Sequence, residues 1–259
     1  MKLQFAGVGS AFTTREFFQS NLIVHKNKKK FLIDVGSDIR LSLHELGYGA
    51  KDVDAFTLTH AHADHCGGVE WLAFCRYFAP GDKPTLYGVG SLLNDIWNKS
   101  LSGGLESIEG RMMRLEDYFP TQVIYPNETF IWENVEFRPV QTVHVMNGFR
   151  IVESYGFMIK DLDDVDGNVV FFTGDTQFAP NQLTKFYEMA NVIFHDCETS
   201  PFKSGVHAHY SDLKNLPENV KSKMYLYHFQ PGDKPDAEKD GFAGYATKGE
   251  MYDPTTIWS

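Results

Sequence analysis

Four side chains that can bind divalent metal ions fall within six consecutive positions of this chain. Imidazole nitrogens and carboxylate oxygens together suit Zn²⁺, Mn²⁺ or Fe²⁺. Small alanines leave room for these side chains to converge, and a glycine pair behind them allows a tight turn. The segment reads His60-Ala61-His62-Ala63-Asp64-His65-Cys66-Gly67-Gly68. We interpret it as a metal-binding loop with enough ligands for two adjacent ions, rather than as a polar loop beside a core strand.

Apolar runs of strand length surround this loop and must position it. Residues 53–59 form such a run and lead directly into His60, and the helix-like stretch 67–78 follows the loop. Two groups of predicted strands, each followed by helix-like stretches, indicate an α/β protein with two mixed sheets flanked by helices in four αββα layers. The predicted strands are residues 3–9, 21–26, 30–36, 53–59 and 85–88, and then 129–132, 135–143, 155–160, 169–173, 191–194 and 223–227.

No linker or repeat divides the chain, so we expect a single domain over residues 1–259. The irregular segment 103–119 is predicted to be a lid or a dimer loop, with a plain surface helix pair as an equally consistent alternative. Residues 231–259 form a tail rich in Gly, Pro and charge. Its aromatic residues Tyr252 and Trp258 favour docking over complete disorder.

The composition excludes several classes of protein. The 259 residues include 24 Lys plus Arg and 34 Asp plus Glu, a formal net charge of −10, which argues against a polyanion-binding surface. With 42% apolar and 22% charged residues, the chain falls in the ordinary globular range. Three cysteines without paired spacing, no signal peptide and no long apolar run predict a reduced, soluble, cytoplasmic protein without a membrane segment.

The motif His60-x-His62-x-Asp64-His65 resembles the signature of the metallo-β-lactamase superfamily. In that superfamily a downstream His, a Gly-Asp after an apolar strand and a final His complete the site, and Val143-His144, Gly174-Asp175 and Tyr227-His228 match them. The resemblance implies the metallo-β-lactamase sandwich and two divalent ions, with Zn²⁺ as first choice and Mn²⁺ as the alternative. It also implies that one ion is held by His60, His62 and His144, the other by Asp64, His65 and His228, and that Asp175 bridges them.

A second group of motifs is similar to the ribonuclease Z-like phosphodiesterase branch of this superfamily. These motifs lie in residues 191–199 and 206–211, and in that branch a carboxylate orients a histidine that protonates the leaving oxygen. The resemblance implies that His209 is the proton donor and Asp196 its orienting carboxylate, with Asp64 as the third catalytic residue. Glu198 competes with Asp196 for this role, and His195 and His207 have weaker claims.

The interval between His144 and Asp175 lacks the long basic arm with which ribonuclease Z holds tRNA, and residues 160–166 are acidic instead. A small substrate is therefore favoured, and nucleic acid is not. The pattern looks most like cyclic nucleotide phosphodiesterases, including the phage-encoded anti-Pycsar enzymes. That resemblance implies attack by a metal-bridged hydroxide on cyclic mononucleotides such as cCMP, cUMP, cAMP or cGMP, which yields nucleoside monophosphates and counters bacterial cyclic-nucleotide immune signalling. It further implies a homodimer, with Arg111, Arg114, Tyr118 and His207 as substrate contacts.

Three other functions remain as alternatives at this point. A tRNA 3′-processing endonuclease would need a basic surface that the composition does not indicate. A thioesterase or lactonase would leave the second histidine motif without a purpose. A binding protein that sequesters a nucleotide without cutting it would be expected to have lost some of the seven ligands.

Overall fold

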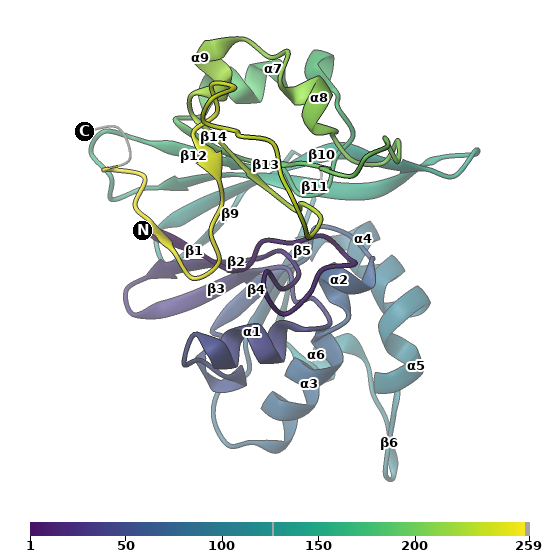
Figure 1. Ribbon diagram of the computed structural model, residues 1–259. Coiled ribbons are helices and arrows are strands. Elements are labelled where there is room, and N and C mark those ends of the chain that lie inside the picture. Colours follow the sequence, from purple (N-terminus) through teal and green to yellow (C-terminus); the bar gives the residue numbers. More distant parts are fainter. Residues whose placement is uncertain (126, 257–259) are drawn as a thin grey trace.

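Two seven-stranded sheets face each other in this computed structural model, which describes residues 1–125 and 127–256 (Figure 1). The first sheet has the order β16-β1-β2-β3-β4-β5-β8. Strands β1 to β3 are antiparallel neighbours, whereas β3, β4, β5 and β8 run parallel. Its strands are β1 (Lys2–Gly7), β2 (Asn21–Lys26), β3 (Lys29–Ile33), β4 (Ala55–Thr57), β5 (Thr85–Val89), β8 (Thr121–Ile124) and β16 (Met251–Tyr252).

The second sheet has the order β15-β14-β13-β12-β11-β10-β9. The strands from β9 to β12 are antiparallel, and those from β12 to β15 are parallel, so both sheets are mixed as predicted. Its strands are β9 (Phe130–Trp132), β10 (Val135–Met146), β11 (Ile151–Asp161), β12 (Val169–Phe172), β13 (Val192–Asp196), β14 (Met224–Tyr227) and β15 (Gly244–Tyr245).

Helices cover the outer face of each sheet, which confirms the four predicted layers (Figure 1). The first sheet is covered by α1 (Ile39–Glu45), α2 (Ala63–Cys66), α3 (Val69–Phe78), α4 (Gly90–Ile96), α5 (Ser102–Leu105) and α6 (Leu115–Tyr118), and the second by α7 (Pro180–Met189), α8 (Tyr210–Leu213) and α9 (Glu218–Lys221). The remaining elements are the 3₁₀ turn η1 (Ala50–Asp52), the π turn η2 (Trp97–Leu101) and the small hairpin of β6 (Ser107–Ile108) and β7 (Arg111–Met112). Within the described ranges no helix is long and apolar enough to cross a bilayer.

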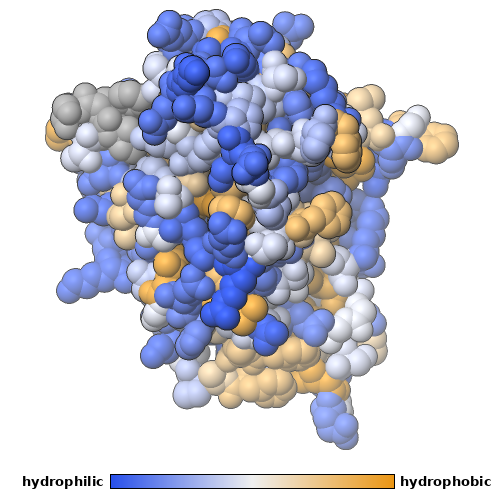
Figure 2. All heavy atoms as spheres, in the orientation of Figure 1, coloured by the Kyte–Doolittle hydropathy of each residue, from blue (hydrophilic) through white to orange (hydrophobic). Residues whose placement is uncertain are grey.

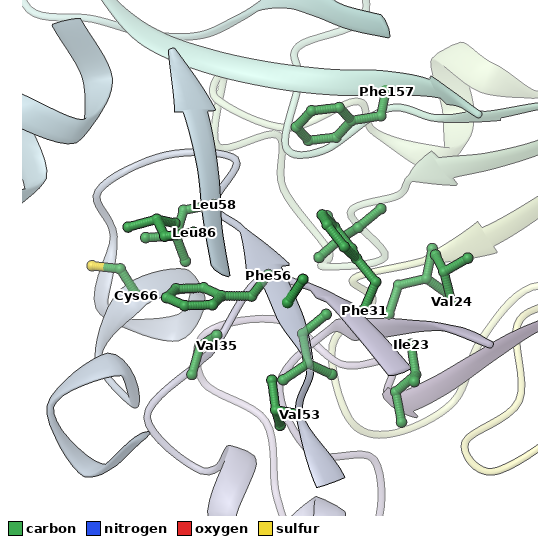
Figure 3. Close-up of a cluster of buried hydrophobic side chains, with 14 of the residues drawn as sticks. Ile23, Val24, Phe31, Val35, Val53, Phe56, Leu58, Cys66, Leu86 and Phe157 are labelled. Atoms are coloured by element: carbon green, nitrogen blue, oxygen red, sulfur yellow. The ribbon is translucent and has the colours of Figure 1, made fainter. Parts of the chain in front are cut away.

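Aromatic side chains fill the space between the two sheets. Phe31 of β3 stacks on Phe137 of β10 with ring centroids 4.6 Å apart, and Phe5 of β1 meets Phe194 of β13 at 5.1 Å. Figure 3 shows Phe31 and Phe157 approaching from opposite sheets beside aliphatic side chains of the first sheet. Since buried apolar surface is the main stabilising contribution to folding, this layer fixes the distance between the two sheets and their strand ends.

The tail that begins at residue 231 joins both sheets. Its strand β15 extends the second sheet beside β14, and its strand β16 pairs with β1 in the first. Tyr252 is buried against Phe5 and Phe194, in line with the expected docking, whereas Trp258 lies outside the described residues. The tail therefore ties the two sheets together behind the interior aromatic layer.

Candidate metal centre

The predicted ligands come from loops and strand ends that meet at one edge of the sandwich. The chain leaves β4 and reaches His60 three residues later, and His62 immediately precedes helix α2, which carries Asp64 and His65. Near the end of β10 lies His144, while Asp175 and His228 follow β12 and β14. Because the carboxyl ends of parallel strands open onto the same side of a sheet, side chains far apart in sequence converge there.

Three histidines form one group of ligand atoms. His60 Nε2 lies 2.9 Å from His62 Nδ1, and His144 Nε2 lies 3.2 Å from the same nitrogen. His60 and His144 are buried, whereas His62 is exposed, so this group opens toward solvent. Burial lowers the pKa of His60 and of His144, which favours the neutral imidazole that a metal ion requires.

Two carboxylates and two histidines form a second, wholly buried group. His65 Nε2 lies 3.2 Å from Asp64 Oδ2 and 3.2 Å from Asp175 Oδ2. His228 Nε2 lies 3.4 Å from each of the same two oxygens. The seven residues expected from the sequence are therefore all brought together in two adjacent groups.

Asp175 lies between the two groups. Its Oδ2 is 3.8 Å from the Nε2 atoms of both His60 and His144, in addition to its contacts with the second group. Burial disfavours the charged carboxylate, but electrostatic attraction to the His228 and His65 rings beside it lowers the pKa of Asp175 well below its usual range. An ionised oxygen that faces both groups is the arrangement that two bridged cations need.

The donor set fits divalent metal ions. His65 Nε2 and Asp175 Oδ1 are buried and make no hydrogen bond within the described part of the chain. Such atoms are rare in folded proteins, because each one left unpaired costs about 1–3 kcal/mol. Imidazole nitrogens mixed with carboxylate oxygens suit Zn²⁺ or Mn²⁺ better than Ca²⁺ or Mg²⁺, which prefer oxygen alone.

The backbone of His228 has an unusual conformation. Its φ of 64° lies in the left-handed region, which non-glycine residues seldom adopt although histidine is enriched there. The conformation is held by His228 N, which donates to Val8 O at 2.7 Å. This turn at the end of β14 directs the imidazole out of the strand direction and toward Asp64 and Asp175.

A carboxylate that the sequence analysis missed lies behind the second group. Asp34 is wholly buried at the end of β3, and its Oδ2 accepts a hydrogen bond from His65 Nδ1 at 2.7 Å. Its Oδ1 accepts from Thr59 N at 2.7 Å and from Thr59 Oγ1 at 3.0 Å. Asp34 therefore fixes the His65 tautomer in which Nε2 is free to face Asp64 and Asp175.

The Asp34→Asn variant is expected to bind Zn²⁺ at the second group about ten- to a hundredfold more weakly, because a neutral amide no longer raises the basicity of His65. Competition with a chromophoric chelator measures this affinity directly. Asp38→Asn is the matched control, since Asp38 is a half-buried carboxylate near Asp64 that belongs to neither group. Unchanged affinity in Asp34→Asn would contradict the role given to Asp34.

The expected pairing of Asp196 with His209 is wrong. Asp196 Oδ2 lies 2.8 Å from His207 Nδ1 and also accepts from Thr176 N at 2.9 Å. The imidazole of His209 is instead used locally, where Nδ1 accepts from Ser211 N at 3.2 Å and Nε2 donates to Ser200 O at 2.9 Å. The chain bends at His207, and of the two imidazoles it is that of His207 that faces the centre, with Nδ1 3.9 Å from Asp175 Oδ2.

Glu198 and His195 do not take part in the centre. The Glu198 carboxylate accepts from Ser204 N at 2.9 Å and so fixes the loop that leads to His207. The two ring nitrogens of His195 are hydrogen-bonded to Tyr187 Oη and to the Asp196 carbonyl, each at 2.7 Å, within the core. Both residues support the backbone around Asp196 and His207.

Within one chain, the predicted substrate contacts of segment 103–119 interact with their own surroundings, and contact of Arg111 or Arg114 with a partner's centre stays a prediction. Tyr118 is completely buried and donates to Leu105 O, so it cannot stack on a base, and this expectation is wrong. Arg111 forms an ion pair with Asp117 at 2.6 Å in the β6–β7 hairpin region, which projects away from the second sheet (Figure 1). Arg114 lines a cavity of about 510 Å³ with residues of α4 and β8.

Comparison with known proteins identifies relatives along nearly the whole chain. A family model described as "Anti-Pycsar protein Apyc1" matches residues 1–252. A protein of that name from Bacillus phage vB_BveM-Goe7 is 32% identical over 258 residues, which cover 96% of each chain. Another from Paenibacillus xerothermodurans is 32% identical over 252 residues, covering 96% of this chain and 93% of the relative.

Solved structures of low sequence identity share the fold. The metallo-β-lactamase fold protein YhfI from Bacillus subtilis superposes with a TM-score of 0.75 at 18% identity, covering 97% of this chain and 99% of that one. A diphosphatase of the PhnP family gives 0.74 at 17% identity, with 97% of each chain covered. The predicted metallo-β-lactamase sandwich is thereby confirmed.

Proposed function

Because the chain belongs to the anti-Pycsar protein Apyc1 family, we propose that it is a metal-dependent phosphodiesterase that opens cyclic mononucleotides and so counters bacterial cyclic-nucleotide immune signalling. The observation that carries the proposal is the pair of ligand groups that share Asp175, with the Asp196–His207 pair beside them. The products would be nucleoside monophosphates.

The proposal assigns one divalent ion to His60, His62 and His144 and a second to Asp64, His65 and His228, with Asp175 facing both. Zn²⁺ is the first choice and Mn²⁺ the alternative. When bound, such ions activate a water molecule and neutralise the charge on phosphate oxygens. A mononucleotide diester carries one negative charge, which suits a buried centre in a chain of net charge −10 better than a polyanion does.

His207 is the proposed proton donor to the leaving oxygen. Its ring centroid lies 4.9 Å from that of His144 and 4.7 Å from that of His228, at the accessible side of the centre. Burial lowers its pKa, but the charge of Asp196 and the hydrogen bond to it outweigh this effect, so the pKa of His207 is raised, which favours the protonated ring that a general acid needs. Asp196 holds Nδ1–H, which leaves Nε2 to donate to a departing alkoxide.

The proposal is tested with purified protein and Mn²⁺ or Zn²⁺ against a panel of purine and pyrimidine cyclic nucleotides, with products separated by chromatography. We expect nucleoside monophosphate from one or more of them, and its loss on addition of a chelator, because the ions supply the activated water. A precursor tRNA runs in parallel. Trimmed tRNA without cyclic nucleotide turnover would contradict the proposal, and so would recovery of unaltered nucleotide bound to the protein.

The proposal extends to a homodimer that acts in the cytoplasm of a bacterium, as the family resemblance implies. Sedimentation velocity of the purified chain tests the dimer. If the protein sediments as a monomer at micromolar concentration, the proposed homodimer is wrong. The proposed reaction does not depend on it, because all seven proposed ligands and His207 come from one chain.

A further inference from the structure

Two exposed phenylalanines stand on the loops that border the residues after His228. Phe12 is 91% exposed in the loop between β1 and β2, and Phe202 is 71% exposed in the loop between β13 and α8. Figure 2 shows orange side chains over both loops, with blue and white ones around them. Other large apolar side chains of the described chain are as exposed, so the position of these two loops decides whether the phenylalanines serve a ligand.

Hydrogen bonds attach both loops to the segment that carries His228. In the first loop, Ser10 N donates to Phe229 O at 3.0 Å. In the second, Thr199 N donates to Gln230 Oε1 at 2.6 Å, and Gln230 N donates back to Thr199 Oγ1 at 3.1 Å. Both phenylalanines therefore belong to loops that are fixed at the His228 edge of the metal centre.

The other ends of these loops also lead to the centre. Gln19, at the end of the first loop, accepts from Ser37 Oγ at 2.9 Å, and Ser37 N donates to the carbonyl of Ala63, which precedes Asp64. The second loop contains His207 near its end, and Val206 O in the same loop accepts from His144 Nδ1 at 2.7 Å. The first loop thus runs from His228 toward Asp64, and the second runs toward His144 and His207.

These positions are within reach of a bound nucleotide. Phe12 is two residues from the anchored Ser10, so their Cα atoms are at most about 7.6 Å apart. The imidazoles and carboxylates described at the centre are assigned here to the metal ions and to the proton donor. Tyr118, the aromatic expected to meet the base, is buried in the core. The base lies one ribose away from the phosphate, so an aromatic residue that stacks on it must come from outside the metal centre and cannot be Tyr118.

We propose that Phe12 and Phe202 bind the nucleobase of the substrate by stacking at the His228 edge of the metal centre. This inference rests on the proposed function. Stacking tolerates any base because every base has a π face, so these residues set the requirement for a base without selecting one base by hydrogen bonds. They contribute to binding and not to the chemical step.

The experiment compares a cyclic nucleotide with methyl riboside 3′,5′-cyclic phosphate, which has no base. Phe12→Ala and Phe202→Ala are each expected to raise KM for the cyclic nucleotide about five- to 150-fold, with kcat within about twofold. The base-free substrate should show unchanged KM. Phe12→Trp and Phe202→Trp should restore KM, because they restore an aromatic face. Calorimetric binding of a hydrolysis-resistant cyclic phosphorothioate should weaken in the alanine variants by the same factor.

Phe78→Ala is the matched control, since Phe78 is also 71% exposed but lies at the far end of α3 from the metal-binding loop. It should leave both substrates unaffected. Equal effects of Phe12→Ala on both substrates, or none on either, would overturn the stacking role while wild-type turnover keeps the proposed function intact. A wild-type protein that cleaves neither substrate would instead overturn the proposed function, and the stacking role with it.

Discussion

Asp175→Asn is expected to leave the chain folded but to reduce bound metal below two ions per chain and to lower kcat at least about a thousandfold. The carboxylate oxygen lies 3.2 Å from His65 Nε2 and 3.8 Å from His60 Nε2, so it faces both ligand groups. An amide keeps the shape but loses the negative charge between two cations. Since the ions supply several kcal/mol of transition-state stabilisation and each 1.36 kcal/mol is tenfold in rate, the loss reaches this size.

Inductively coupled plasma mass spectrometry gives the metal content, and initial rates at saturating substrate give kcat. Asp64→Asn provides an informative contrast, because Asp64 belongs to the second group alone and its loss should leave one ion in place. Asp38→Asn should keep both ions. Circular dichroism and thermal unfolding confirm that each variant is folded. Two ions and near wild-type kcat in Asp175→Asn would exclude it as the shared ligand.

The sequence predicts most of the interior of this fold, because apolar runs of strand length indicate burial directly. The predicted run 169–173 and the observed β12 (Val169–Phe172) differ by one residue. The short strands β15 and β16 were missed, since Gly244–Tyr245 and Met251–Tyr252 have no apolar pattern of their own. They form because β14 and β1 present unpaired sheet edges beside which the tail runs, and this is tertiary information.

In the candidate site too, some residues could be predicted from local sequence and others could not. His60 to His65 could be found because their spacing is local, whereas His144, Asp175 and His228 were found only by resemblance to a known family. Asp34 was missed although it is a single carboxylate at the end of an apolar run, which is a usable signal for a buried functional group.

The error over His207 and His209 has a different cause, since a motif with two histidines does not state which one faces inward. Glu198 pairs with His209 in an isolated bridge, and Ala208 is buried in the neighbouring core. Positions 207 and 209 lie on either side of Ala208, so alternation along the chain does not distinguish them, and only the contact with Asp196 identifies His207 as the residue at the centre. Sequence alone lacks that contact.

His207→Ala is expected to lower kcat for cyclic nucleotides about 10²- to 10⁴-fold, the range for loss of a positioned general acid. His209→Ala should leave kcat within about threefold, because its ring nitrogens are bonded to Ser211 and Ser200 rather than aimed at the centre. The two residues lie two positions apart, and this makes each the matched control of the other. Metal content should remain at two ions in both variants, which separates loss of the acid from loss of a ligand.

A substrate with a better leaving group sharpens the test. An aryl phosphodiester departs as a phenolate that needs little protonation, so His207→Ala should be impaired far less with it than with a cyclic nucleotide, whose alkoxide requires a proton. Asp196→Asn should show the same pattern more weakly, because the amide still contacts Nδ1 but no longer raises the pKa of His207. If His209→Ala instead showed the larger loss and the dependence on leaving group, His207 would not be the acid, despite its contact with Asp196.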